Sequence, residues 1–197
     1  PLCHAAYRGH VKVLQYLLSK GADINFADYL GDSPLEHAAG AGENAAIEFL
    51  LKNNADINRR NKIGFTPIYS AIKWGKLDSV KLLVEHGADV NANPEGFTPL
   101  ESAITGGQKD IAIYLINHKA RFDAFCISAA VQYDYKDIFK LLMDNGANIN
   151  GIDNNGLAPL HYALFARNLE AMKFLVNNGA DINMKTEKDY TVPTPDG

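Results

Sequence analysis

The sequence repeats a five-residue phrase at a nearly fixed interval, and this repetition restricts the fold more than any other feature. The phrase Gly-Ala-Asp-Ile-Asn occupies residues 21–25 and 179–183, and variants of it occupy 54–58, 87–91 and 146–150. The first three copies are 33 residues apart. A period of about 20–50 residues is typical of a solenoid, in which each unit buries its apolar face against its neighbours. The sequence therefore predicts a stack of similar units that presents surfaces rather than encloses a reaction site.

A second recurring phrase marks the start of the first helix in each unit. It is a Pro followed by an apolar residue, with a small apolar pair two residues later. Pro suits the first turn of a helix, where its missing N–H needs no partner. A Ser or Thr precedes it at Ser33, Thr66 and Thr98 and is expected to cap the helix. The helices are expected to begin near Pro1, Pro34, Pro67, Pro99, Cys126 and Pro159.

Glycines separate the predicted helices. A Gly eight residues after the Pro suits a left-handed helix end, at Gly9, Gly42, Gly75 and Gly107. A second helix follows, with apolar residues spaced three and four apart. The Gly of the five-residue phrase ends this helix, and Asn54 takes that place in the second copy because Asn tolerates the same backbone region. Each unit is thus predicted to be helix, turn, helix and hairpin.

These phrases together resemble the ankyrin repeat, whose consensus contains Asp-x-x-Gly-x-Thr-Pro-Leu-His-x-Ala-Ala and Gly-Ala-Asp-Val-Asn. Residues 153–161 and the Gly9-His10 turn match it almost letter for letter. The resemblance covers the whole chain and implies an all-α solenoid with short β-hairpin loops, as a single domain over 1–197. The expected repeats are 1–27, 28–60, 61–92, 93–123, 124–152 and 153–185, with 186–197 as a partial seventh repeat or a loop tail.

The sequence departs from the family pattern at the His that follows Pro-Leu. The resemblance implies that this His hydrogen-bonds to backbone in the adjoining turns, and it is present only as His161. The other five positions hold Cys3, Glu36, Tyr69, Glu101 and Ser128. We therefore expect lower stability than that of a consensus array.

The five-residue phrase is broken at Lys119–Asp123. Only two residues separate this segment from Cys126, six fewer than the usual spacing, so the hairpin is predicted to be absent there. One interpretation is a deletion that a loop tolerates. The other is a gap in the row of hairpins that admits a partner or bends the solenoid.

Composition and charge exclude several classes of partner. The net charge of −4 gives no electrostatic attraction for nucleic acid or an acidic membrane surface. The longest apolar runs are far too short to span a membrane. The two cysteines form no disulfide or metal pattern, which favours a reducing, cytoplasmic location, or the host-cell cytosol for a microbial effector. Because the chain starts in mid-repeat, it is expected to be a fragment, and targeting segments would lie outside it.

No catalytic, cofactor-binding or metal-binding residue is predicted. The segment 40–45 fits the letters of a dinucleotide fingerprint, but a helix precedes it where that motif needs a strand. Cys3 and His4 are adjacent in sequence, which does not make a nucleophile pair. His86 and His118 are expected to lie at helix ends, and no two histidines have metal-ligand spacing.

The sequence predicts that the chain binds a protein or an extended peptide and catalyses no reaction. In ankyrin-like stacks, partners meet the concave surface made by the hairpin tips and the exposed side of the first helix. Trp74, the only Trp, is the first candidate, since Trp, Tyr and Arg are frequent interface hot spots. Carried over position by position, the surface contains Tyr7, Arg8, Tyr29, Leu30, Asp32, Lys62, Ile63, Phe65, Lys73, Trp74, Phe97, Gln132, Tyr133, Leu157 and Phe165.

Alternatives remain open at this point. Phe65 and Phe97 are equally explained by packing against the next hairpin. The chain is alternatively a recruiting or regulatory segment of a larger enzyme or microbial effector whose active domain lies outside it. A monomer is expected, although end-to-end self-association through uncapped terminal repeats is a third hypothesis.

Overall fold

The computed structural model describes residues 1–92 and 98–186, which form twelve short α-helices and, over these ranges, no β-strand. The chain divides into two compact units, Pro1–Arg121 and Phe122–Gly197, where the sequence suggested one domain. The helical repeat architecture predicted from the sequence is confirmed. The partial seventh repeat or tail expected at 186–197 lies outside the described residues except for Thr186.

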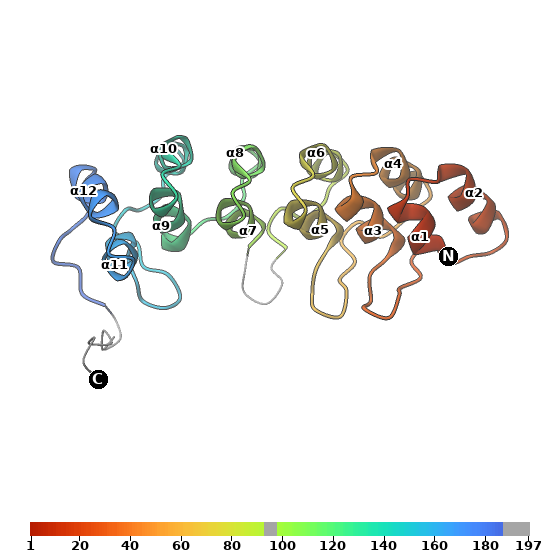
Figure 1. Cartoon of the computed structure of the whole chain (residues 1–197), viewed down its shortest axis with the longest axis horizontal. Coiled ribbons are helices and arrows are strands. Elements are labelled where there is room, and N and C mark those ends of the chain that lie inside the picture. The colour runs from red at the N-terminus through yellow and green to blue at the C-terminus, as the bar shows by residue number, and fades with distance from the viewer. Residues whose placement is uncertain (93–97, 187–197) are drawn as a thin grey trace. The chain divides into compact units, whose positions relative to one another are not determined.

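The first unit contains four helix pairs (Figure 1). The first helices of the pairs contact one another in sequence order, α1 to α3, α3 to α5 and α5 to α7, and the second helices do the same. The pairs are α1 (Leu2–Tyr7) and α2 (Val11–Ser19), α3 (Pro34–Ala41) and α4 (Asn44–Lys52), α5 (Pro67–Lys73) and α6 (Leu77–Glu85), and α7 (Pro99–Thr105) and α8 (Lys109–Asn117).

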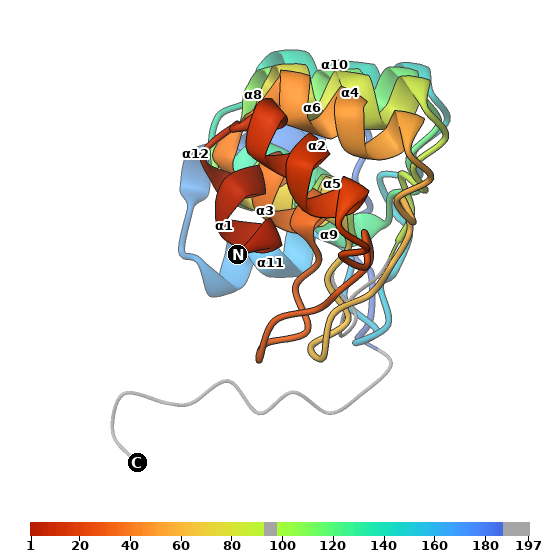
Figure 2. The ribbon, with the colours of Figure 1, turned by 90° about the vertical axis from the view of Figure 1, so that its right-hand side faces the viewer.

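The core of this unit lies between the two rows of helices. Small residues at one register of the first helices, such as Ala38 and Ala71, are completely buried and let neighbouring helices approach closely. Leu50 and Leu83 fill the space from the second helices. Figure 2, viewed from the N-terminal side, shows the loops between α2 and α3 and between α4 and α5 projecting away from the helices in one direction.

The second unit contains two helix pairs: α9 (Ala124–Gln132) with α10 (Lys136–Asp144), and α11 (Pro159–Phe165) with α12 (Leu169–Asn177). Helix α9 contacts α10, α11 and α12. The rings of Phe139 and Phe174 meet edge to face with centroids 4.8 Å apart, which joins the second helices.

The recurring phrase ends each second helix in the left-handed region, as predicted. Its first residue has φ of 85° at Gly21 and 91° at Gly87, and Asn54 adopts 65° in the second copy. Lys119 has φ of 63° in the broken copy, although a Cβ makes this conformation unfavourable. The turn glycines behave as predicted too, with φ of 65° at Gly9 and 86° at Gly42.

The last Asn of the phrase connects successive repeats. Its Oδ1 accepts a hydrogen bond from a backbone N–H in the next copy of the phrase, about 30 residues further along the chain. The middle acidic or amide residue of the phrase accepts the N–H two residues on, for example Asp23 from Asn25, which holds the Asn in place. The four connections join Asn25 to Asp56, Asn58 to Asp89, Asn91 to Arg121 and Asn150 to Asp181.

The broken phrase changes the fifth repeat. Asp123, at the Asn position, accepts the N–H groups of Phe125 and Cys126 and so caps α9. Six residues (118–123) connect α8 to α9, against fourteen (20–33) between α2 and α3, so the predicted loss of the hairpin is confirmed. The expected helix start near Cys126 is late, since α9 begins at Ala124. The loop is thus eight residues shorter than its counterpart. Because α9 is also two residues longer than α5, the net shortening is the six residues read from the sequence.

The position of the family's His is filled by different residue types in different repeats. His161 accepts the Ala158 N–H at Nδ1 and donates from Nε2 to the Met184 carbonyl, as the resemblance implied. Glu36 and Glu101 replace the first of these bonds by accepting the cap N–H of their own helix in capping boxes. In the fifth repeat the position belongs to Cys126, three residues after the cap, and assigning it to Ser128 was wrong.

The predicted helix caps are confirmed at two of three positions. The side chains of Ser33 and Thr98 accept the N–H of the third helical residue. Thr66 makes no such bond, and its buried Oγ1 has no hydrogen-bond partner. Tyr69 stands where the other two helices have Glu and offers no carboxylate to complete a capping box.

The connections between repeats should contribute measurably to stability. Asn58→Ala removes the acceptor for the Asp89 N–H. We expect a loss of about 1 kcal/mol in unfolding free energy and faster hydrogen exchange at the Asp89 amide. Asn53→Ala is the control, because the Asn53 side chain bonds to the Phe49 carbonyl in its own repeat. Equal effects of the two variants on the Asp89 amide would contradict this role.

Lys119 offers the opposite test, a stabilising substitution. Lys119→Gly relieves the left-handed strain at φ 63° and should raise the unfolding free energy by about 0.5–1 kcal/mol. Lys140→Gly, inside α10, should instead lower it by about 1 kcal/mol. Urea unfolding monitored by circular dichroism measures both, and destabilisation by Lys119→Gly would count against the strain argument.

Candidate functional site

An open groove of about 880 Å³ crosses the first helices of the first unit, α1, α3 and α5. Four of the residues predicted from the sequence line it: Tyr7, Arg8, Asp32 and Trp74. The sequence analysis did not select its other lining residues, which are His4, His10, Glu36, His37, Gly40, Ala41, Glu43, Ser70 and Lys76.

Side-chain size explains why the groove exists. Gly40 and Ala41 on α3 stand 33 residues after Tyr7 and Arg8 on α1, and 33 before Lys73 and Trp74 on α5. A small pair therefore lies between two large pairs at the same register. Gly40 is close to Trp74, since a Cβ built on it would be 3.1 Å from the indole Cδ1. The small pair forms the floor, and this size pattern was readable in the sequence.

The groove walls are exposed aromatic side chains. Tyr7 is 51% exposed and Trp74 is 66% exposed, and both are close to the end of a first helix. The Trp74 backbone N–H bonds to the Ser70 carbonyl, so the backbone that carries the indole is fixed by the helix end. Large exposed aromatic groups beside a hollow are typical of interaction sites.

Charged residues of both signs line the groove. Arg8 and Lys76 bring positive charge, and Asp32 and Glu43 bring negative charge. The Glu43 side chain lies over Gly9, and Lys76 lies over Gly42, so each covers the turn of the preceding repeat. The mixed charge suits a polar peptide better than a ligand of one charge sign.

The hairpin tips form a separate exposed cluster. Tyr29 is 80% exposed, and Leu30 and Ile63 are also exposed. Lys62 joins neighbouring tips, since its Nζ donates to the Tyr29 carbonyl at 2.6 Å and its backbone N–H donates to the Leu30 carbonyl at 3.2 Å. None of these four residues lines the groove.

Phe65 and Lys73 pack against their own repeat. The rings of Phe65 and Tyr69 have centroids 4.2 Å apart. The Lys73 Nζ lies 5.2 Å from the centroid of the Phe65 ring, a cation–π contact. These contacts pack Phe65 within its own repeat, whereas the expected alternative was packing against the next hairpin. Phe97, which was open to the same interpretation, lies outside the described residues.

The four residues of the second unit that were predicted to bind a partner differ in exposure and in surroundings. Gln132 lines a second hollow of about 510 Å³ together with residues of α10 and α12. Tyr133 is exposed and stacks on Tyr135 with ring centroids 5.7 Å apart. Phe165 is exposed at the end of α11. Leu157 is only 5% exposed, so its expected place on the surface was wrong: the turn closed by Asp153 directs it into the core.

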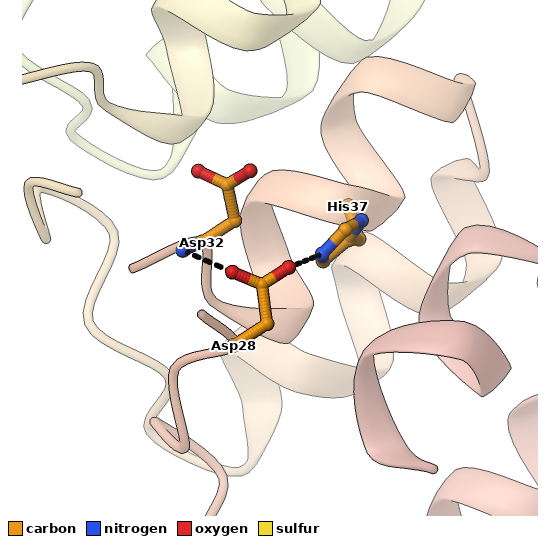
Figure 3. A group of neighbouring side chains, drawn as sticks. All are labelled: Asp28, Asp32 and His37. Atoms are coloured by element: carbon orange, nitrogen blue, oxygen red, sulfur yellow. Dashed lines mark hydrogen bonds and ion pairs between the residues drawn. The ribbon is translucent and has the colours of Figure 1, made fainter. Parts of the chain in front are cut away.

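Asp32 and His37, which line the groove, and Asp28 come close enough together to suggest metal ligands (Figure 3). Their hydrogen bonds account for the arrangement instead. The Asp28 carboxylate accepts the N–H groups of Leu30 and Asp32, and its other oxygen lies 2.9 Å from His37 Nε2. Asp32 accepts from Asn61 in the next hairpin at 2.6 Å. The cluster thus holds two hairpins against α3.

The same device closes the hairpins of other repeats. Asn61 accepts the N–H groups of Ile63 and Phe65, and Asp153 accepts those of Asn155 and Leu157. Tyr162, nine residues after Asp153, donates its hydroxyl to that carboxylate, as His37 bonds to Asp28 nine residues before it. In the described ranges, the hairpins expected from the sequence are therefore turns held by side-chain and backbone hydrogen bonds, without residues in strand conformation.

These hydrogen bonds also lower the pKa values of the carboxyl groups that accept them. Burial raises the pKa of Asp28, but the hydrogen bond from His37 and those from the Asp32 and Leu30 N–H groups outweigh burial and leave the pKa below its usual value of 3.8. Asp153 shows the same balance, with its pKa lowered by bonds from Tyr162 and Leu157 against the effect of burial. Both carboxylates stay ionised near neutral pH, as their hairpin bonds require.

The first unit is a stack of helix pairs that carries an open, partly aromatic groove, which is the architecture of a repeat solenoid. The sequence matches the family described as "Ankyrin repeats (3 copies)" over residues 1–61, 59–126 and 119–186. The chain therefore belongs to the ankyrin-repeat family. Ankyrin repeats are generally protein-interaction modules. In the described part of the chain, no helix has the length and hydrophobicity to cross a membrane.

Similar proteins come from distant sources. FPV233, an ankyrin repeat protein of fowlpox virus, is 38% identical over 61 residues, which are 30% of this chain and 12% of the viral protein. Protein phosphatase 1 regulatory subunit 27 of Mus musculus is 35% identical over 60 residues, 30% of this chain and 39% of that protein. The chain thus aligns with less than half of either relative. The human ASB11 ankyrin repeat domain is similar over 95% of this chain and 87% of its own, with 26% identity and a TM-score of 0.77.

Asp28 should be essential to its hairpin. Asp28→Ala leaves the N–H groups of Leu30 and Asp32 without their acceptor and should lower the unfolding free energy by about 2 kcal/mol at pH 7. Asp28→Asn should lose much less, because Asn61 performs this role in the next hairpin.

The pH dependence provides the second half of the test. A lowered folded-state pKa means that ionised Asp28 stabilises the fold above its usual pKa of 3.8, and that this contribution disappears as pH falls through the lower folded-state value. The stability difference between wild type and Asp28→Asn should therefore narrow below about pH 4. A difference that stays constant from pH 7 to pH 3 would contradict the role of the charge.

Proposed function

We propose that this chain is a protein-interaction scaffold that binds a partner protein or an extended peptide in the groove across α1, α3 and α5. The observation that carries this proposal is the position of Trp74. Its indole is 66% exposed, borders a hollow whose floor is Gly40 and Ala41, and is attached to a rigid helix end. An aromatic side chain that loses little freedom on binding is a favourable interface anchor.

The groove residues have complementary roles in this proposal. Tyr7 and Trp74 offer apolar area on either side of the floor. Arg8 and Asp32 offer a donor and an acceptor for the polar groups of a peptide. The exposed hairpin tips at Tyr29 and Ile63 would extend the contact for a larger partner. Nothing in this set requires a cofactor, and we propose no catalysis.

Charge favours a protein partner over other classes. The net charge of −4 repels nucleic acid and acidic lipid surfaces, whereas the groove itself contains both signs of charge. We propose a monomer that acts in a reducing, cytoplasmic environment, and the presence of Cys3 and Cys126 as thiols rather than as a disulfide is in accord with this.

A second candidate is a regulatory segment of a larger protein or effector. The observation in its favour is the similarity to a protein named as a phosphatase regulatory subunit. End-to-end self-association is a further candidate, favoured by the exposed Leu169 and Val176 of α12 and the exposed Tyr16 of α2. Sedimentation at increasing protein concentration tests the latter.

Peptide display on the immobilised chain, followed by affinity measurement, tests the main proposal. Peptides selected on the wild type should bind Trp74→Ala about 30-fold more weakly, a loss of about 2 kcal/mol. The thermal melt of the variant should be nearly unchanged, because most of the indole is exposed.

Tyr16→Ala is the matched control. Tyr16 is 61% exposed, much like Trp74, but lies on a second helix outside the groove. Its replacement should leave affinity within about twofold. Selected peptides that bind Trp74→Ala and wild type equally would refute the groove as the binding site. A large fall in stability without a fall in affinity would make Trp74 a packing residue.

A further inference from the structure

The carboxyl group of Glu36 is buried in the first unit with only one of its two oxygens paired. Glu36 is 2% exposed. Its Oε2 accepts the backbone N–H of Ser33 at 2.8 Å, and this bond completes the capping box of α3. Its Oε1 is buried and has no hydrogen-bond partner. A buried carboxylate oxygen without a partner carries a large free-energy cost, so its protonation state needs an explanation.

The repeat register indicates what Oε1 faces. Cys3, 33 residues earlier, has its S–H directed at two backbone carbonyls, that of Phe26, 23 residues after it, at 3.7 Å and that of Asp32 at 3.8 Å. His161, at the same place in its own repeat, donates from Nε2 to the carbonyl of Met184, also 23 residues later. The residue 23 positions after Glu36 is Arg59. Cys3 and His161 thus each donate a proton to a backbone carbonyl, and a carboxylate at this position has no proton to donate.

We propose that Glu36 is protonated in the folded chain and donates Oε1–H to the backbone carbonyl of Arg59, which fastens the loop of residues 53–66 to α3. One oxygen then accepts from Ser33 and the other donates to Arg59, which reproduces both hydrogen bonds of the family's His. Loss of the proton places one lone pair against another and releases the loop. This loop carries Asn61, whose bond to Asp32 reaches the groove, so release would alter the binding surface.

The electrostatic surroundings support a retained proton. Burial raises the pKa of Glu36 to about 8, and the neighbouring charge of Asp32 raises it too. The bonds from Ser33 and the charge of Arg59 act in the opposite direction and are outweighed. The packed helices α1, α4 and α5 carry further titratable groups: Cys3, His4 and Tyr7 on α1, Glu48 and Lys52 on α4, and Tyr69 and Lys73 on α5.

The sign of the pH effect follows from this raised pKa. Between the usual value of 4.5 and about 8, the folded chain keeps a proton that the unfolded chain has released. Stability therefore falls as pH rises through this window and is constant with respect to Glu36 outside it. The unfolding equilibrium constant should rise by up to about tenfold per pH unit through the Glu36 contribution.

Isotope-edited infrared spectroscopy observes the proton directly. With the glutamate side-chain carboxyls labelled by ¹³C, the difference between wild type and Glu36→Gln at pH 6.5 should contain the C=O stretch of one protonated carboxylic acid. A difference spectrum with carboxylate bands alone at that pH would overturn the proposal. An ionised pair with Arg59, whose Nε is also buried and unpaired, is the arrangement that result would indicate.

Urea unfolding from pH 5 to pH 8.5 provides an independent readout. The wild-type unfolding constant should rise at least 100-fold more than that of Glu36→Gln across this range, because Gln cannot ionise. Glu48→Gln, an exposed glutamate on α4, is the charge-matched control and should follow the wild type. Glu36→His, which restores the family's residue, should also remove the rise and covers the case in which the Gln variant fails to fold. Parallel curves for wild type and both Glu36 variants would refute the proposal, whether or not Trp74 binds a peptide.

Discussion

The connection from the last Asn of each phrase to the next phrase is the interaction on which the repeat geometry depends. The Asn58 side chain bonds to the Asp89 backbone, so the end of one repeat directly positions the end of the next. Asn91 makes the last such bond of the first unit, to Arg121. At the following Asn position stands Asp123, which caps a helix instead. The boundary between the two compact units, after Arg121, thus coincides with the place where this series of bonds is interrupted.

Much of the fold could be predicted because the repeat places the same physical demand at the same position many times. The left-handed helix ends, including Asn54, follow from backbone sterics alone. Features that depend on a substitution in one repeat alone could not be predicted. The start of α9 at Ala124 depends on Asp123 acting as a cap, and no repeated pattern indicates that choice. The burial of Leu157 depends on how Asp153 closes its turn.

The binding surface was predicted in part. Register alone identified Tyr7 and Trp74 as residues that the core does not need, and the structure places both on one groove. The groove floor was not predicted, because the sequence analysis selected large residues and not the small pair Gly40-Ala41 that lies between them. Register also grouped the hairpin tips with the groove, whereas Lys62 and its neighbours form a cluster of their own. Location on the same side of the repeat is therefore a weaker criterion for a common binding site than location in the same groove.

The central claim is that residues left free by the repeat pattern make one binding groove across α1, α3 and α5. The most direct measurement is a map of amide and indole N–H chemical shifts as a display-selected peptide is added. The account predicts that the largest changes fall on the Trp74 indole and on the amides of Tyr7, Gly40 and Ala41, with small changes on α2, α4 and α6. Largest changes on those second helices, with the Trp74 indole unaffected, would contradict it.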